Sequence, residues 1–106
     1  MTLCRIVPRQ GAEQDIAEAV DYYFGEGGVE LSLQFIESLE AAFGQLAAHP
    51  ESGSPRYATE LDLPGLRHWP LNKFPYLIFY VLNADVVDVW RLLHGKRDIP
   101  ETMRGE

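Results

Sequence analysis

Two apolar runs near the C-terminal end of the chain are separated by a short Asn-Ala-Asp segment. Residues 76–82 read YLIFYVL and residues 86–90 read VVDVW. Aromatic and β-branched residues of this kind are typical of buried strands. Asn and Asp side chains hydrogen-bond to the nearby backbone and tolerate left-handed conformations, so residues 83–85 suit a tight turn. The pattern predicts a β-hairpin over residues 75–93.

Earlier in the chain the apolar residues recur with a helical period. Residues 11–24 and 29–48 each place apolar side chains on one face and acidic or amide side chains mainly on the other. Gly25, Gly27 and Gly28 lie between the two segments and interrupt the pattern. The sequence therefore predicts two helices that form an antiparallel hairpin.

Two further strands complete the predicted sheet. Residues 3–7 are a short first strand closed by Pro8, and residues 66–71 are a strand near a sheet edge because Pro70 cannot donate to a ladder. Residues 49–65 are rich in Pro, Gly and Ser and predict an ordered surface crossing. The order predicts an α+β fold: an N-terminal strand, an antiparallel helical hairpin, then three strands forming a mainly antiparallel sheet, with the helices on one face.

Length and composition indicate one ordinary globular domain over residues 1–106. The chain is 46% hydrophobic and 24% charged, and it is too short for two cores. No apolar run approaches the roughly 20 residues that span a bilayer, and no secretory pattern begins the chain. We therefore expect a cytoplasmic protein without a membrane partner. Cys4 is the only cysteine, so an internal disulfide is excluded, and we expect it to pack in the first strand.

The net charge of −7 and pI near 4.8 disfavour general nucleic-acid binding, so we expect no direct contact with DNA or RNA. The charge is uneven, however. Acidic residues dominate the helical half, whereas the strand half contains Arg67, Lys73, Arg91, Lys96 and Arg97. A local basic patch on the strand half is compatible with this distribution.

The motif LLHGKRDIP behind the strand PYLIFY resembles the C-terminal signature of ParE toxins in the RelE/ParE superfamily of bacterial toxin–antitoxin systems. Three segments before this motif, AEQDIAEAVDYY, LAAHPESG and LPGLRHWPLNKFPYLIFY, also occur in the order found in the family. The resemblance covers nearly the whole chain and implies a RelE/ParE-like fold.

The resemblance also implies a function and two partners. ParE-like toxins are understood to inhibit DNA gyrase by protein–protein contact and to be neutralised by a ParD-like antitoxin. Arginine is enriched at interfaces, so we expect gyrase to contact Arg67, Arg91, Lys96 and Arg97, unless these residues form surface ion pairs. For the antitoxin we expect an apolar groove along the helices and the sheet edge, with contacts at Tyr22, Tyr23, Phe24 and Trp69. The acidic helices predict a basic antitoxin segment.

Two alternatives stay open. One is a RelE-like, ribosome-dependent mRNA endoribonuclease, for which the family alignment supplies only Arg97 after the last strand and His68 at one of the strand positions. The remaining family positions fall on Pro70, Leu77 and Met103, which lack the needed chemistry. We therefore expect no catalytic residues. The other alternative is a degenerate, non-toxic module that still binds an antitoxin.

The three histidines give no sign of a metal or cofactor site. His49, His68 and His94 are far apart and lack ligand spacing. His68 on a strand is more often structural than catalytic, and His49 and His94 stand where side chains cap a helix end or a loop. We expect neither metal nor cofactor.

Overall fold

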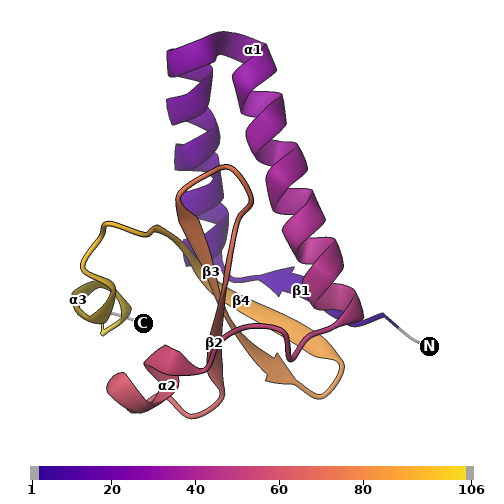
Figure 1. The fold of residues 1–106 in the computed structure, drawn as a ribbon, viewed down its shortest axis with the longest axis vertical. Coiled ribbons are helices and arrows are strands. Elements are labelled where there is room, and N and C mark those ends of the chain that lie inside the picture. The colour runs from indigo at the N-terminus through magenta and orange to yellow at the C-terminus, as the bar shows by residue number, and fades with distance from the viewer. Residues whose placement is uncertain (1–2, 105–106) are drawn as a thin grey trace.

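The structure is a computed structural model that describes residues 3–104. Within that range it contains a four-stranded sheet, a long helical hairpin and two short helices (Figure 1). The elements follow in the order β1 (Arg5–Pro8), α1 (Gln10–Ala48), α2 (Arg56–Glu60), β2 (Leu66–Pro70), β3 (Tyr76–Asn83), β4 (Val86–His94) and α3 (Ile99–Met103).

Element α1 is two helical arms joined by a sharp turn. Helical geometry fails at Gly27 (φ −146°, ψ 16°) and Gly28 (φ 72°, ψ −161°). A positive φ strains residues that carry a Cβ atom, which explains glycine at position 28. The two arms run side by side, and the tip projects beyond the sheet (Figure 1). The predicted hairpin and the site of its break are confirmed.

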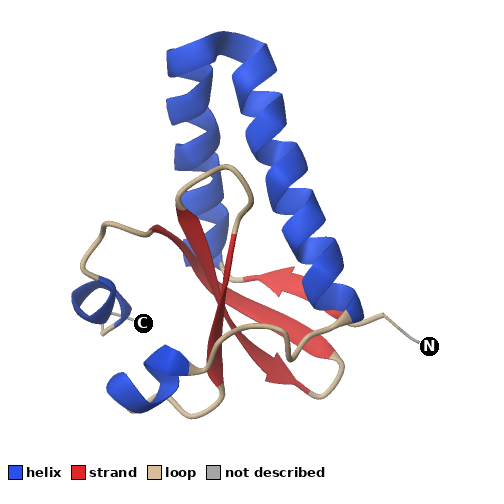
Figure 2. Ribbon diagram, in the orientation of Figure 1, coloured by secondary structure: helices blue, strands red, loops and turns tan. Residues whose placement is uncertain are grey.

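The sheet has the strand order β1-β4-β3-β2, shown in red in Figure 2. β1 is parallel to β4, and the other two pairs are antiparallel, so the predicted mainly antiparallel sheet is confirmed. Asn83 pairs with Val86, which leaves Ala84 and Asp85 as a two-residue turn instead of the predicted three. Ala84 supplies the left-handed conformation, with φ 54°.

The face of the sheet toward α1 holds the larger core cluster. Phe35, Leu39 and Leu46 from α1 pack with sheet residues that include Ile78 and Tyr80. The half-buried Cys4 also packs against this cluster, as expected, but it precedes β1, which begins at Arg5. Burial of this apolar stripe, more than helix propensity, stabilises the two arms.

The opposite face of the sheet is not open, and the expectation of helices on one face only is wrong. Successive strand residues point to opposite faces, and Phe79, the neighbour of Ile78, belongs to a second cluster. Ile99 and Met103 of α3 are buried in this cluster, and Tyr57 of α2 packs against it. Helices of five residues each are too short to show a helical period in the sequence, so they were missed.

Candidate functional site

Arg67 is held by the loop that follows α1. Its guanidinium donates to the carbonyl oxygens of Glu51 at 3.0 Å and Gly53 at 2.7 Å. The Tyr80 hydroxyl fixes the same loop, donating to the Pro50 carbonyl at 2.7 Å and accepting the Gly53 N–H at 2.9 Å. Burial raises the pKa of Tyr80, which keeps the hydroxyl a donor. The contacts of Arg67 therefore position a loop within this chain.

Arg91 forms a partly buried ion pair with the first arm of α1. Its guanidinium donates to the two carboxylate oxygens of Asp15 at 2.6 and 2.9 Å, and the Leu92 N–H donates to the same carboxylate at 3.0 Å. β1 pairs with β4 only as far as Val89, so Asp15 satisfies a backbone donor that lies beyond the end of β1. The ion-pair alternative considered for the arginines is confirmed at Arg91.

Lys96 and Arg97 lie in the exposed loop between β4 and α3. The loop backbone is fixed: the Gly95 N–H donates to the Pro75 carbonyl at 2.8 Å and the Arg97 N–H to the His94 carbonyl at 3.0 Å. The Lys96 N–H donates to His94 Nδ1 at 3.1 Å, which confirms His94 as a loop-capping residue. The two cationic side chains thus extend from an ordered backbone into solvent.

Arg97 also borders a small pocket beside the first arm of α1. The pocket has a volume of about 160 Å³, and its walls include Glu18, Tyr22, Tyr76 and His94. The next residue, Asp98, caps α3 by accepting the Glu101 N–H at 3.2 Å. The Asp98 carboxylate, considered in the sequence as an ion-pair partner of Arg97, therefore caps the N-terminus of α3.

The four residues expected at an antitoxin interface lie on separate surfaces. Tyr22 is 58% exposed beside the pocket of Arg97, and Phe24 is 55% exposed. A helix turns 100° per residue, so these two side chains point to nearly opposite sides of the first arm. Tyr23 is half-buried and stacks with Phe35, with ring centroids 5.2 Å apart. Burial and the neighbouring Tyr76 raise the pKa of Tyr23, which behaves as a core residue.

Trp69 lies in a groove between the second arm of α1 and the β2 edge. The groove has a volume of about 370 Å³, and its walls include Ser38, Ala41, Gln45 and Asn72. Ser38 Oγ donates to the Asn72 carbonyl at 2.6 Å and fixes the end of the groove. A second hollow of about 180 Å³ shares Ser38, Ala41 and Asn72 and continues along the arm. A groove with both apolar and polar walls thus lies between the second arm and the sheet edge.

His68 lies on the other face of the sheet, under α2. It pairs with Phe79 across the strands, and its ring lies 5.2 Å from that of Tyr57 between centroids. Burial and nearby Arg56 lower its pKa. Its Nδ1 is buried and has no hydrogen-bond partner within residues 3–104. Arg97 borders the α1 side, so the sheet separates the two residues of the ribonuclease alternative.

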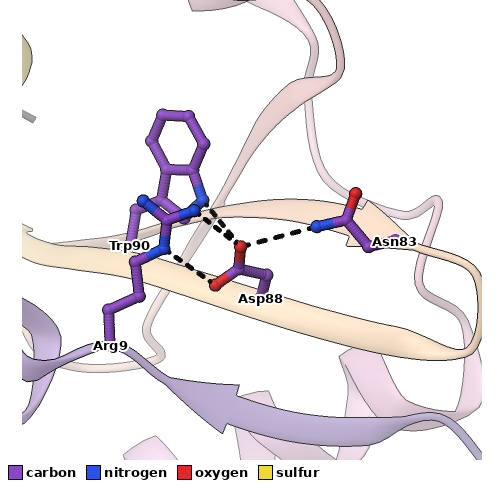
Figure 3. A network of polar contacts seen from close by, with 4 residues as sticks. All are labelled: Arg9, Asn83, Asp88 and Trp90. Carbon is purple, nitrogen blue, oxygen red and sulfur yellow. Dashed lines mark hydrogen bonds and ion pairs between the residues drawn. The ribbon is translucent and has the colours of Figure 1, made fainter.

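A polar network that the sequence analysis missed joins β1 to the hairpin strands (Figure 3). Arg9 donates to both carboxylate oxygens of Asp88, at 3.1 and 2.9 Å, and lies 4.4 Å above the Trp90 ring. The Trp90 indole and the Asn83 amide donate to the same carboxylate at 3.1 and 3.5 Å. The sign of this network in the sequence was Asp88, a lone carboxylate within the valine-rich run VVDVW. The network fixes the start of α1 against β4 and makes Trp90 a structural residue.

Charge is strongly divided between the two halves of the fold. The helical hairpin α1 contains eight acidic residues and no Lys or Arg, whereas the rest of the chain has nine basic and eight acidic residues. Across residues 3–104 no group of three or more His, Cys, Asp or Glu side chains is placed to hold a metal ion. No helix in the described range is long and apolar enough to cross a membrane.

Comparison with known proteins assigns the family. The family model of the ParE toxin of the type II toxin–antitoxin system parDE matches residues 6–99. A solved structure titled as the chromosomal ParDE TA system from P. aeruginosa is similar in fold, with a TM-score of 0.71 at 18% identity, covering 87% of this chain and 96% of that one. No curated protein sequence matches significantly. With more than half of its length matched, this chain belongs to the ParE toxin family of type II toxin–antitoxin systems.

Proposed function

We propose that this protein is a cytoplasmic toxin that inhibits DNA gyrase by protein–protein contact and is neutralised by a ParD-like antitoxin. Membership of the ParE toxin family over residues 6–99 carries the proposal. Inhibition of this kind needs a complementary surface and no reactive side chain.

Lys96 and Arg97 are the proposed gyrase contacts. Both side chains are exposed, while the backbone N–H groups of residues 95–97 are held by hydrogen bonds to Pro75 and His94. A preordered loop loses little entropy on binding, and a guanidinium offers a rigid set of donors to carboxylates of a partner. Arg91 supports this surface by holding the end of β4 against α1, whereas Arg67 holds the loop after α1.

The groove at Trp69 is the proposed site of the antitoxin. It combines apolar carbon from Ala41 and Pro70 with polar groups from Gln45 and Asn72, a mixture that suits a peptide segment. Segments that fold on binding commonly lie in such grooves. Tyr22 lies on a separate surface beside the pocket of Arg97 and does not line this groove.

The ribonuclease alternative draws less support from the geometry. His68 lies beneath α2 with a lowered pKa, and Arg97 borders the α1 side of the sheet. A base and a cation must act on one phosphodiester together. Ribosomes carrying mRNA, incubated with the toxin, would show cleavage that His68→Ala abolishes if this alternative were correct.

The deciding experiment combines folded toxin, free of antitoxin, with gyrase, ATP and supercoiled plasmid, followed by denaturation. We expect linear plasmid covalently attached to gyrase, increasing with toxin concentration. The double variant Lys96→Glu/Arg97→Glu should lose most of this activity, while Lys73→Glu, an exposed charge reversal elsewhere, should retain it. No linear DNA from wild-type toxin would refute the gyrase target. Full activity of the folded double variant would refute the proposed contacts.

A further inference from the structure

The small pocket beside the first arm of α1 collects polar side chains from distant parts of the chain. Tyr22 comes from α1, Tyr76 from the start of β3, His94 from the end of β4, and Arg97 from the loop that follows. The pocket volume of about 160 Å³ is below the roughly 300 Å³ at which pockets begin to hold drug-sized molecules. The pocket therefore suits a single side chain or a small ion.

The two carboxylates in the pocket wall are already engaged by neighbouring donors. Asp15 accepts from the Arg91 guanidinium at 2.6 and 2.9 Å. Glu18 accepts from the Gln14 amide, one turn earlier on the helix, at 3.2 Å. Arg97, in contrast, forms no ion pair with any part of the chain that the structure describes. Its guanidinium is therefore the charge at this pocket that lacks a counter-ion.

The Tyr76 hydroxyl has a proton to donate close to this guanidinium. Burial, foremost, raises the pKa of Tyr76, whereas nearby Arg97 lowers it, and the net increase keeps the phenol protonated at neutral pH. Tyr23 donates a hydrogen bond to Tyr76, since the bond favours the protonated form of Tyr23 and the ionised form of Tyr76. The Tyr76 O–H is thus left to donate to another acceptor.

His94 contributes a second neutral donor. Its Nδ1 accepts the Lys96 N–H at 3.1 Å, which requires this nitrogen to be unprotonated. A neutral imidazole carries one proton, so the proton of His94 is on Nε2. The imidazole packs edge-to-face with the Tyr76 ring, with centroids 5.3 Å apart. The phenol and the imidazole therefore hold each other in place at the pocket.

We infer that this pocket binds one carboxylate group, that of an Asp or Glu side chain of DNA gyrase. The guanidinium, the phenol O–H and the Nε2–H all present protons, and a carboxylate accepts at about four lone-pair sites. Glu18 stays in the wall, so a phosphate dianion meets more repulsion there than a carboxylate with one charge. The inference rests on the proposed function, because it names the group that Arg97 contacts on gyrase.

Sodium acetate is the probe, since it offers one carboxylate and no other polar group. Proton–nitrogen correlation NMR spectra of the purified toxin, free of antitoxin, are recorded while acetate replaces chloride at constant ionic strength. The signals of His94, Lys96 and Arg97 should move and saturate, with a dissociation constant on the order of 10 mM. Inorganic phosphate at the same ionic strength should bind at least about threefold more weakly.

Two Tyr→Phe variants within one pocket separate the hydroxyl that donates to the ligand from one that does not. Tyr76→Phe removes the proposed donor, keeps the ring, and should weaken acetate binding about fivefold. Tyr22→Phe removes a hydroxyl that already donates to Glu26 at 3.4 Å, so acetate binding should stay unchanged. Arg97→Gln removes the charge and should weaken binding about tenfold or more. The same spectra show whether each variant is folded.

The gyrase cleavage assay tests the source of the carboxylate with the same pair of variants. The toxin concentration that gives half-maximal linear plasmid should rise about fivefold for Tyr76→Phe and stay unchanged for Tyr22→Phe. Wild-type inhibition by folded Tyr76→Phe would overturn gyrase as the source. Equal losses in the two variants would do the same, because they would not follow the hydroxyl that binds acetate.

Three NMR results would overturn the carboxylate site itself. These are the absence of saturation with acetate, equal acetate affinity of wild-type toxin and Tyr76→Phe, and tighter binding of phosphate than of acetate, which would assign the pocket to phosphate groups. The NMR titration contains no gyrase. Acetate binding as described, together with a wild-type toxin that yields no linear plasmid, would therefore refute the gyrase target and the named occupant while the carboxylate site stands.

Discussion

The base and the tip of the helical hairpin α1 differ in how the chain uses their side chains. At the base, Asp15 accepts three hydrogen bonds from β4, and Ala12 and Leu46 are fully buried. At the tip, Val29 and Leu33 are at least half exposed among acidic residues. The base therefore serves folding within this chain, whereas the tip leaves apolar side chains in solvent that the fold does not use.

Phe35 and Leu33 give the strongest test of this difference because they stand on one arm, two residues apart and on opposite faces. Phe35 is fully buried and packs against Tyr23, Phe74 and Tyr76. Phe35→Ala should lower the free energy of unfolding by about 4 kcal/mol, by lost burial and a cavity, and Leu33→Ala by less than about 0.5 kcal/mol. Urea denaturation measures both. Equal losses would show that the tip is part of the core.

Asp15 and Asp21 provide the electrostatic comparison on the first arm. Asp15→Ala removes the acceptor of the Arg91 guanidinium, whose side chain is only 18% exposed, and of the Leu92 N–H. We expect a loss of about 3 kcal/mol. Asp21 is exposed, so Asp21→Ala should change stability by less than about 0.5 kcal/mol. Thermal unfolding at fixed pH compares the two, and a stable Asp15→Ala protein would contradict the assigned role.

The turn between the arms is tested by two glycines. Gly28 has φ 72°, so Gly28→Ala should destabilise the protein by about 1 kcal/mol. Gly25 is helical, and a Cβ atom there would meet nothing within 4 Å, so Gly25→Ala should stabilise by up to about 1 kcal/mol. Effects of the same sign, measured by urea denaturation, would show that the turn geometry is wrong.

The smallest expected effect concerns His68, on the face away from the hairpin. Burial and Arg56 lower its pKa below the usual 6.5, so the unfolded chain binds the proton more readily. Its contribution to stability is fully present above about pH 6.5 and is lost as the pH falls toward the native pKa. His68→Phe should reduce the change of the free energy of unfolding with pH below pH 6.5, measured by urea denaturation at a series of pH values. An unchanged curve would show that His68 does not titrate differently in the native state.

Long periodic segments were predictable from the sequence, and short ones were not. The helical hairpin and its break at Gly27 and Gly28 followed from apolar spacing and glycine, and the β3–β4 hairpin from aromatic and β-branched runs. α2 and α3 are too brief for a period to appear, so the covering of the second sheet face was missed. The chain was correctly expected to belong to the ParE family because several motifs occur in family order.

The candidate site depended more on tertiary structure. The sequence by itself identified the basic residues and the acidic character of the helices, since charge and composition are local properties. It could not show that Arg91 pairs with Asp15, 76 positions away, that Arg67 holds a loop, or that only part of the basic set extends into solvent. Partners of side chains are decided when distant segments meet, and in this protein that step separates Arg67 and Arg91, which hold the fold together, from Lys96 and Arg97, which stay exposed.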